Sequence, residues 1–101
     1  MIVGQMVKEP GEEITVGIDF TEDLTTGETV DSAVVTSRHA ATLSNTSGTF
    51  LSQAAAEIIT PVVSKRCQGG AHGETHLVQI RVVTSLGNSY EHEVEVMVVE
   101  S

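Results

Sequence analysis

The last third of the chain alternates between apolar and polar residues over two long segments, 74–84 and 90–99. Successive side chains of a β-strand point to opposite faces, so this rhythm gathers valines and isoleucines on one face of each segment. The opposite face of the second segment carries Glu91, Glu93 and Glu95. Gly87 and Asn88 lie in the short turn between the two segments, as is typical of a β-hairpin. The pattern predicts a hairpin whose apolar face must be covered by a second layer of structure.

Segments nearer the N-terminus show the same two-residue rhythm over shorter lengths. The apolar positions of the most regular one are Ile14, Val16, Ile18 and Phe20. We predict strands over 13–20 and 29–37, and an edge strand over 2–8. Proline followed by glycine within 9–12 predicts a turn between the first two strands.

The middle of the chain is its least regular part, rich in alanine, serine and threonine. We predict a turn over 45–48 and a short strand over 49–51. The alanines that follow favour a helix that begins at Ser52 and ends before Pro61. The surrounding β pattern instead favours an extended edge segment that the proline interrupts. We favour a strand over 57–67.

Polar or glycine-rich connections separate these elements. The loop 21–28 contains one apolar residue, Leu24, which we expect to close one end of the core, and the glycine-rich stretch 68–74 leads into the final hairpin. No internal repeat is visible. The sequence predicts an all-β chain, a single antiparallel immunoglobulin-like β-sandwich of about six to eight strands that occupies 1–101 as one domain. The missing tryptophan and cysteine pair exclude an antibody-type domain.

The net charge and the length of the apolar runs exclude some classes of function. The formal net charge is −9, from 14 acidic and 5 basic residues, and eight of the acids fall between Glu9 and Asp31. Such a surface repels phosphate backbones, so we expect no nucleic-acid partner. No apolar run approaches the ~20 residues that span a bilayer, and the N-terminus lacks a basic signal-peptide region, so we expect neither membrane association nor an export signal.

The histidines and the single cysteine are the first candidates for chemistry. His72, His76 and His92 would form a zinc site only if they converged, with Glu74 and Glu91 nearby. Their placement in a loop and on strands gives no common face. We expect His76 and His92 to lie at the edge of the interior, conceivably near each other, with backbone groups as hydrogen-bond partners. His39 has no visible ligand set. Cys67 has no disulfide partner and is expected to be an inert thiol.

The carboxylates point to solvation more than to catalysis. Glu91, Glu93 and Glu95 form an exposed row, and we expect Arg81 on the neighbouring strand to relieve their repulsion. The acids from Glu22 to Asp31 lack the alternating Asp/Asn positions and the terminal Glu of an EF-hand loop. A loose calcium site at one end of the sandwich remains an alternative. The glycine run 69–73 lacks the Lys-Ser/Thr of a phosphate loop. We therefore assign no catalytic, cofactor-binding or metal-binding residue and expect no cofactor and no enzyme activity.

Four short motifs occur in a fixed order along the chain. They are Lys8-Glu9-Pro10-Gly11-Glu12 with Ile18-Asp19-Phe20 after it, Asp23-Leu24-Thr25-Thr26-Gly27-Glu28-Thr29-Val30, Gly69-Gly70-Ala71-His72-Gly73-Glu74-Thr75-His76, and Val83-Thr84-Ser85-Leu86-Gly87-Asn88. In this order the sequence resembles small phage and prophage virion structural proteins with an immunoglobulin-like sandwich, of the fibre–tail adaptor or minor head–tail type. The resemblance covers 8–37 and 67–99 and fails in between. His76 stands where the resembling chains usually have tyrosine.

The resemblance implies a non-enzymatic virion component, assembled in the host cytoplasm, which binds other tail or head proteins. It implies no catalytic residues, and a homo-oligomer is compatible with it. We expect the contact surfaces in the loops 21–28 and 68–74 and along the edge 2–8. The rival hypothesis is a bacterial immunoglobulin-like surface module that uses its end loops for calcium or carbohydrate. Scarce aromatic residues argue against sugar stacking in that alternative.

Overall fold

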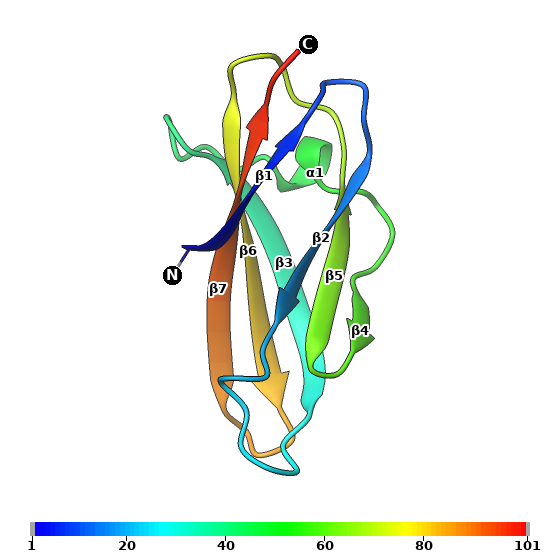
Figure 1. Cartoon of the computed structure of the whole chain (residues 1–101), viewed down its shortest axis with the longest axis vertical. Coiled ribbons are helices and arrows are strands. Elements are labelled where there is room, and N and C mark those ends of the chain that lie inside the picture. The colour runs from blue at the N-terminus through cyan, green and yellow to red at the C-terminus, as the bar shows by residue number, and fades with distance from the viewer. Residues whose placement is uncertain (1, 101) are drawn as a thin grey trace.

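The computed structural model describes residues 2–100 and shows an elongated molecule of 43 × 23 × 21 Å whose regular secondary structure is almost all β-strand (Figure 1). Its elements are β1 (Ile2–Lys8), β2 (Ile14–Asp19), β3 (Val30–His39), α1 (Ser47–Phe50), β4 (Glu57–Ile59), β5 (Val62–Cys67), β6 (Thr75–Thr84) and β7 (Ser89–Val98). They form a four-stranded sheet, β1-β7-β6-β3, and a three-stranded sheet, β2-β5-β4. The predicted all-β sandwich is confirmed. No helix in the described chain is long and apolar enough to cross a membrane.

The core is aliphatic and comes from the inward faces of both sheets. Its fully buried side chains include Val16, Phe20, Val63, Val78, Ile80, Val82, Val96 and Val98. These are the alternate positions of the predicted strands, because β-branched residues favour the extended backbone and fill the space between two sheets. Leu24 is partly buried against this cluster, as expected for a residue that closes one end of it.

The predicted C-terminal hairpin is confirmed, over 75–84 and 89–98. β6 and β7 are antiparallel, with Ile80 opposite His92 and Arg81 opposite Glu91. Gly87 supplies the positive φ of 80° in the connecting turn, a conformation that glycine adopts without steric cost. Because Val94, Val96 and Val98 of β7 face the core, the alternating glutamates of the same strand face away from the three-stranded sheet.

β1 departs from the antiparallel prediction. It is the edge strand that was expected over 2–8, but it pairs with β7 in parallel, from Ile2 opposite Glu93 to Lys8 opposite Val98. The turn that follows Lys8 carries the chain across to the other sheet, so β1 and β2 belong to different sheets. A parallel pair of this kind joins the two ends of the sequence and cannot be seen in local patterns.

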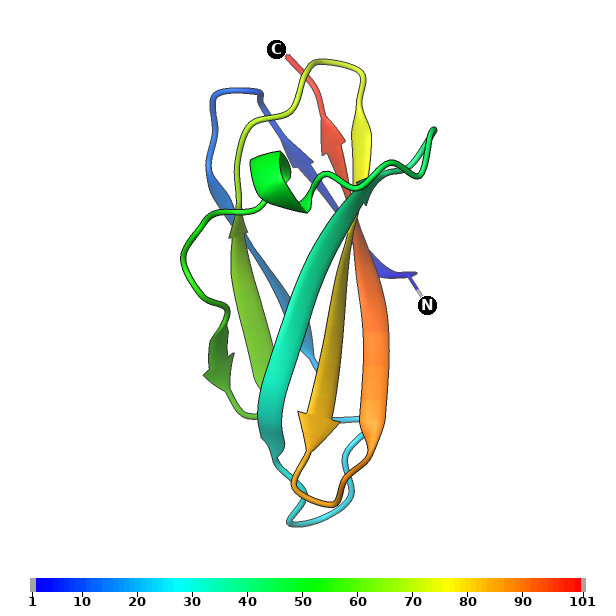
Figure 2. The same ribbon diagram turned by 180° about the vertical axis from the view of Figure 1, so that it is seen from behind.

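The middle of the chain contains two further corrections. A short helix, α1, replaces the strand predicted over 49–51, and the predicted turn over 45–48 lies instead at 40–42. Burial of Phe50 in the core stabilises this helix. The alternative helix that would begin at Ser52 does not form. Figure 2 shows α1 beside the upper ends of β3 and β5.

The strand predicted over 57–67 is two strands. β4 and β5 pair antiparallel, with Ile59 opposite Val62, so the chain reverses at Thr60 and Pro61 instead of continuing as one edge segment. The bond between these two residues is cis. β4 is the outer strand of its sheet, and all three of its residues are exposed.

Candidate interaction surfaces

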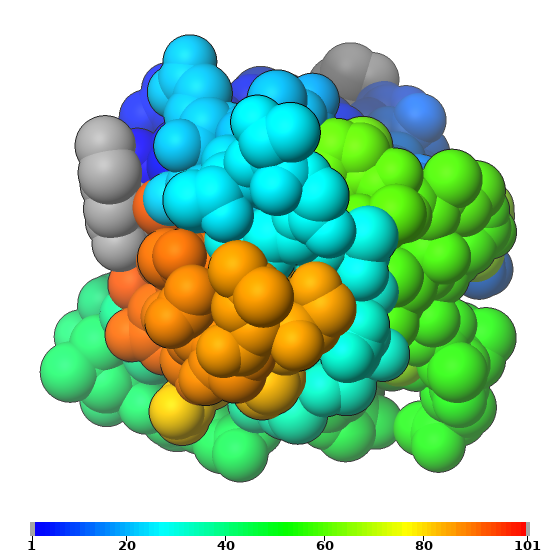
Figure 3. All heavy atoms as spheres, turned by 90° about the horizontal axis from the view of Figure 1, so that it is seen from below, coloured from blue at the N-terminus to red at the C-terminus, as the bar shows by residue number. Residues whose placement is uncertain are grey.

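Two of the three predicted contact segments lie at opposite ends of the molecule, and the third contacts both of them. The loop 21–28 belongs to the lower end of the molecule in Figure 1, together with the turns at 60–61 and 85–88. The connection 68–74 belongs to the opposite, upper end, together with the turn 9–13 and α1. β1 begins at mid-height and runs up to the upper end (Figure 1). Figure 3 looks onto the lower end, where these three connections pack against one another.

Glu28 organises the lower end from within. Its side chain is almost completely buried, with 5% of the residue exposed. One carboxylate oxygen accepts hydrogen bonds from the backbone N–H and the hydroxyl of Thr25, at 3.0 and 3.4 Å. The other accepts from the hydroxyl of Thr84 and from the Asn88 amide at 3.0 Å. The Thr84 hydroxyl, and then the Thr25 N–H and Asn88, hold the pKa of Glu28 below its ordinary value.

Further hydrogen bonds fasten the same three connections. The N–H of Thr29 donates to the Ser85 hydroxyl at 3.0 Å, and the N–H of Ser85 donates back to the Thr29 carbonyl at 2.9 Å. The N–H of Val30 donates to the Thr60 hydroxyl at 3.0 Å. The loop after β2 is therefore tied both to the β6–β7 turn and to the β4–β5 turn, and the lower end forms one ordered surface.

His92 ties the loop to the side of the sandwich. Its Nε2 lies 2.8 Å from Asp23 Oδ2, and its ring stacks on Phe20 with centroids 5.4 Å apart. The expectation that this ring would bond to a backbone group is wrong, because its Nε2 contacts the Asp23 carboxylate instead. His92 Nδ1 is buried without a hydrogen-bond partner, the only such side-chain atom found among residues 2–100.

Two hollows open beside the loop 21–28, one at the lower end and one on the side of the sandwich. One is lined mainly by threonines and by Leu24, and it lies between the loop 21–29 and the Thr60–Pro61 turn. The other lies between the first half of β1 and the segment 19–23. Its lining residues are Val3, Asp19, Thr21, Glu22, Asp23 and His92. Both offer concave surface for a protruding side chain of a partner.

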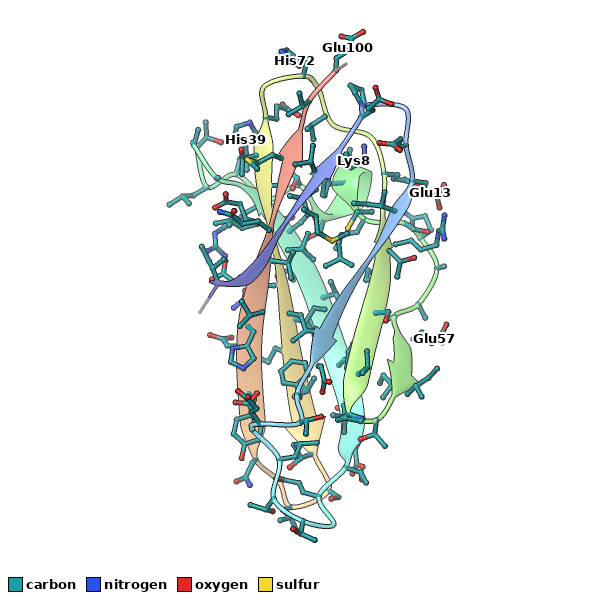
Figure 4. The ribbon with its side chains drawn as sticks, in the orientation of Figure 1. Lys8, Glu13, His39, Glu57, His72 and Glu100 are labelled. Atoms are coloured by element: carbon teal, nitrogen blue, oxygen red, sulfur yellow. The ribbon has the colours of Figure 1, made fainter. Side chains whose placement is uncertain are left out.

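Lys8 organises the upper end in a comparable way. The side chain is buried, with 1% of the residue exposed, and Nζ donates to the Glu9 carbonyl at 2.7 Å and to the Gly69 carbonyl. Burial lowers the pKa of this ammonium group. Figure 4 shows Lys8 on β1 in the upper half of the molecule, with His72 and Glu100 at its tip. The turn after β1 and the glycine-rich connection are thus held together by one amine.

Gly70 is required by space as well as by backbone conformation. Its φ is +87°, and a Cβ atom there would lie 2.8 Å from Val98 Cγ2 and 3.3 Å from the Phe50 ring. Any larger residue would displace the end of β7 or the helix α1. The glycine-rich segment is a connection between strands β5 and β6, as predicted, and it is close-packed at Gly70.

His76 joins α1 and the β3–β4 connection to the sheet. Its ring stacks on Phe50 at a centroid distance of 4.0 Å, Nδ1 lies 3.2 Å from Thr46 Oγ1, and Nε2 lies 3.2 Å from Glu74 Oε1. The other oxygen of Glu74 lies 3.5 Å from His39 Nε2. The Ala71 N–H and then His76 lower the pKa of Glu74. The backbone partners expected for His76 are wrong, because side chains contact both of its ring nitrogens.

The arrangement of histidines corrects two expectations. His76 lies opposite Val96 and His92 opposite Ile80, so the two rings sit at different levels of the sheet, and His39 is the neighbour of His76. His39 therefore has a carboxylate partner that sequence reasoning missed. No group of three or more histidine, cysteine or acidic side chains in residues 2–100 has the geometry to hold a metal ion.

The glutamates of β7 find partners other than the predicted Arg81, and only Glu91 of the row expected to be exposed is so, because Glu93 and Glu95 are half-buried. Glu93 pairs with Arg38 of β3 at 2.8 Å, Glu91 accepts from Gln79 at 2.9 Å, and Glu95 accepts from Gln5 at 3.3 Å. β6 lies between β7 and β3, so Arg38 reaches across it. The row is a solvated, hydrogen-bonded surface.

Cys67 is buried beneath the upper end, as expected for a thiol without a disulfide partner. Burial raises its pKa to about 11. The thiol therefore remains protonated at neutral pH.

The sequence matches the model of one known protein family. The model for Gp77, described as podophage GP4 fiber-tail adaptor protein gp77, matches residues 8–97. The match includes all four motifs and also the middle of the chain, where the resemblance was not recognised. No curated protein matches the sequence.

Proposed function

We propose that this chain, a member of the podophage GP4 fiber-tail adaptor family gp77, joins a fibre protein to a tail protein through direct contacts and catalyses no reaction. Family membership makes it a phage tail adaptor and a component of the virion. The contact mechanism, the absence of catalysis and assembly in the host cytoplasm are parts of the proposal. The family also favours this function over the rival calcium- or carbohydrate-binding surface module.

The proposal rests on one observation: at each end of the molecule, two sequence motifs are held together by hydrogen bonds. The Lys8 turn is fastened to Gly69 at the upper end, and the loop that contains Glu28 is fastened to Thr84 and Asn88 at the lower end. Buried polar networks of this kind hold a surface in one conformation before binding, which lowers the entropic cost of association. An adaptor needs two such surfaces, one for each neighbour.

Each end also presents groups that a protein partner can contact. At the lower end Leu86 and Ile59 are exposed near the threonine-lined hollow. At the upper end Ala71 and His72 are exposed on the connection to β6. Protein–protein interfaces combine an apolar centre with a polar rim, and each end exposes both kinds of group.

The surface charge indicates which partners fit. Of the basic residues, Lys8 is buried, Arg38 pairs with Glu93 and Arg66 pairs with Glu13. The accessible charge is therefore mostly negative, which favours partner surfaces rich in lysine and arginine and disfavours nucleic acid. We also retain the immunoglobulin-like assignment as part of the proposal, since β7-β6-β3 facing β2-β5-β4 follows the order of such sandwiches.

The proposal is tested by placing the same bulky cation at each end separately. Leu86→Arg changes the lower end, Ala71→Arg changes the upper end, and Val34→Arg, on an exposed strand position between them, is the matched control. Each variant is supplied to a phage that lacks the gene, and the protein composition of purified particles is measured by quantitative mass spectrometry.

We expect the two end variants to have different consequences. One should reduce incorporation of the adaptor itself at least about tenfold, and the other should leave the adaptor in the particle but deplete the fibre, consistent with about 1.4 kcal/mol lost at one interface. Val34→Arg should behave as the wild type does. Normal particles for both end variants, or loss of the same neighbour in both, would contradict a two-ended adaptor.

A further inference from the structure

The two sheets end in four edge strands, β1 and β3 in one sheet and β2 and β4 in the other. An unpaired edge can accept a strand from another chain, so proteins protect their edges with charged residues or keep them short. β4 has only three residues. β2 ends at Asp19, and β3 carries Asp31 and Arg38. Each of these three edges has some protection.

β1 lacks such protection. It is seven residues long, and Lys8, its only charged residue, is turned inward and buried. Ile2, Val3 and Val7 are exposed to 49%, 46% and 60%. A register shift between Ile2 and Gly4 affects only the first residues, and the pairing with β7 is regular from there to the end of the strand. Among the described residues, no backbone hydrogen bond joins β1 to a strand other than β7.

The open edge continues below β1 along β7. β1 covers β7 only from Glu93 onward, while the preceding residues of β7, from Ser89 to His92, pair with β6 alone. The hollow lined by Val3, Asp23 and His92 lies beside this uncovered stretch. A strand edge, exposed apolar side chains and a hollow therefore form one continuous surface on this side of the sandwich.

The charges around this surface indicate what kind of chain fits it. Asp19, Glu22 and Asp23 line the hollow, which has no lysine or arginine in its lining. Across the β1–β7 ladder, Glu95 lies opposite Gln5, while Glu93, opposite Ile2, is already paired with Arg38. A second copy of this chain would bring the same carboxylates and a net charge of −9 to the contact. Opposite charges favour association and like charges disfavour it, so a basic segment of another protein fits better.

We propose that β1 and the hollow beside it accept an extended segment of another virion protein, in which lysine or arginine accompanies apolar residues, by strand addition. Main-chain hydrogen bonds to the free edge would supply affinity, and the side-chain positions would supply specificity. This inference rests on the proposed adaptor function and adds the chemistry of one partner to it.

The test compares charges of opposite sign at one exposed position of the edge. Val7→Lys places a cation against the incoming basic segment, while Val7→Glu changes the size and polarity of the side chain with the opposite charge. Val34→Lys is the matched control, because Val34 is 64% exposed on the other edge of the same sheet. The measured quantity is the number of adaptor chains per purified particle, after complementation of a phage that lacks the gene.

We expect Val7→Lys to lower incorporation at least about tenfold, Val7→Glu to lower it less, and Val34→Lys to leave it unchanged. Incorporation of Val7→Lys at the wild-type level would overturn the inference while leaving the adaptor function intact. Equal losses for Val7→Lys and Val7→Glu would overturn the basic chemistry of the partner. Absence of the wild-type chain from particles would instead contradict the proposed function. Thermal melting of the purified variants identifies any loss that is due to unfolding.

A second measurement identifies the occupant directly. A photo-crosslinking amino acid at position 7 is incorporated into the adaptor, assembled particles are irradiated, and the linked peptides are sequenced by mass spectrometry. The expected product is a peptide of a different virion protein that contains lysine or arginine beside apolar residues. A product that links two copies of this chain, or a partner peptide without basic residues, would overturn the inference.

Discussion

The carboxylate of Glu28 accepts a hydrogen bond from the hydroxyl of Thr84, which lies 56 positions further along the chain. This contact connects the loop after β2 with the end of β6. Asn88, four residues beyond Thr84, donates to the same carboxylate oxygen. Two motifs that are far apart in the sequence are therefore parts of one structural unit at the lower end.

Replacement of Glu28 by glutamine should destabilise the fold. The amide has one oxygen instead of two and places an NH₂ group against donors, so at least one buried donor loses its acceptor. We expect Glu28→Gln to lower the Tm by on the order of 5 °C, measured by circular dichroism. Glu22→Gln, which removes an exposed carboxylate from the same loop, is the control and should leave the Tm within about 1 °C. Equal Tm values for the two variants would contradict the role assigned to Glu28.

Acid should weaken the fold through the same carboxylate. Hydrogen bonds lower the folded-state pKa of Asp19, Glu28 and Glu74. A group with a lowered pKa contributes stability above its unfolded value, about 3.9–4.3, and this stability is lost as the pH falls through the folded value. We expect the midpoint of urea unfolding to change little between pH 7 and 5 and to fall below about pH 4. Glu28→Gln should show a smaller fall than the wild type; an equal fall would assign the acid sensitivity elsewhere.

Two glycines allow backbone strain to be separated from steric crowding. Gly70 and Gly87 both have positive φ, but only at Gly70 would a Cβ atom meet neighbours within 4 Å. We expect Gly87→Ala to cost about 1–2 kcal/mol in the free energy of unfolding, from the backbone conformation alone. Gly70→Ala should cost about 1–3 kcal/mol more, because Val98 and Phe50 must move. Denaturant titration measures both values, and a Gly70→Ala cost no larger than that of Gly87→Ala would contradict the close packing of the upper end.

Cys67 should react slowly in the folded protein. A thiol with a pKa of about 11 has at pH 8 only a small fraction of the thiolate present in an ordinary cysteine, and its burial blocks access further. We expect alkylation at pH 8 to be at least about 100-fold slower than in guanidinium chloride. Comparable rates in both conditions would show that the upper end opens readily.

The local pattern was sufficient to predict the elements whose two faces differ. β2 and the β6–β7 hairpin could be predicted because alternate residues such as Val16, Ile18, Val78 and Ile80 all face one dry interior. The loops 21–28 and 68–74 were recognisable from their polar and glycine-rich composition. These features require only neighbours in the sequence.

The errors concern contacts between residues far apart in the chain. The helix α1 forms because Phe50 packs against His76, 26 positions away, whereas its own sequence, Ser-Gly-Thr-Phe, has weak helix propensity. The parallel pairing of β1 with β7 joins the two ends of the sequence. At the candidate surfaces, the partners of Glu28, Lys8 and His92 could not be predicted for the same reason. A buried glutamate in a polar loop, or a buried lysine at the end of an edge strand, gives no local signal of its burial.

The parallel pairing of β1 and β7 has a mechanical consequence. β1 begins at the side of the molecule and runs upward, and β7 leaves at the top, so the two chain ends emerge from opposite ends of one ladder (Figure 1). Tension applied to these ends pulls the two strands past each other along their length. All rungs of the ladder then bear the load together in shear, instead of opening one after another as in a zipper. The sandwich is thus built to resist stretching along its sequence termini.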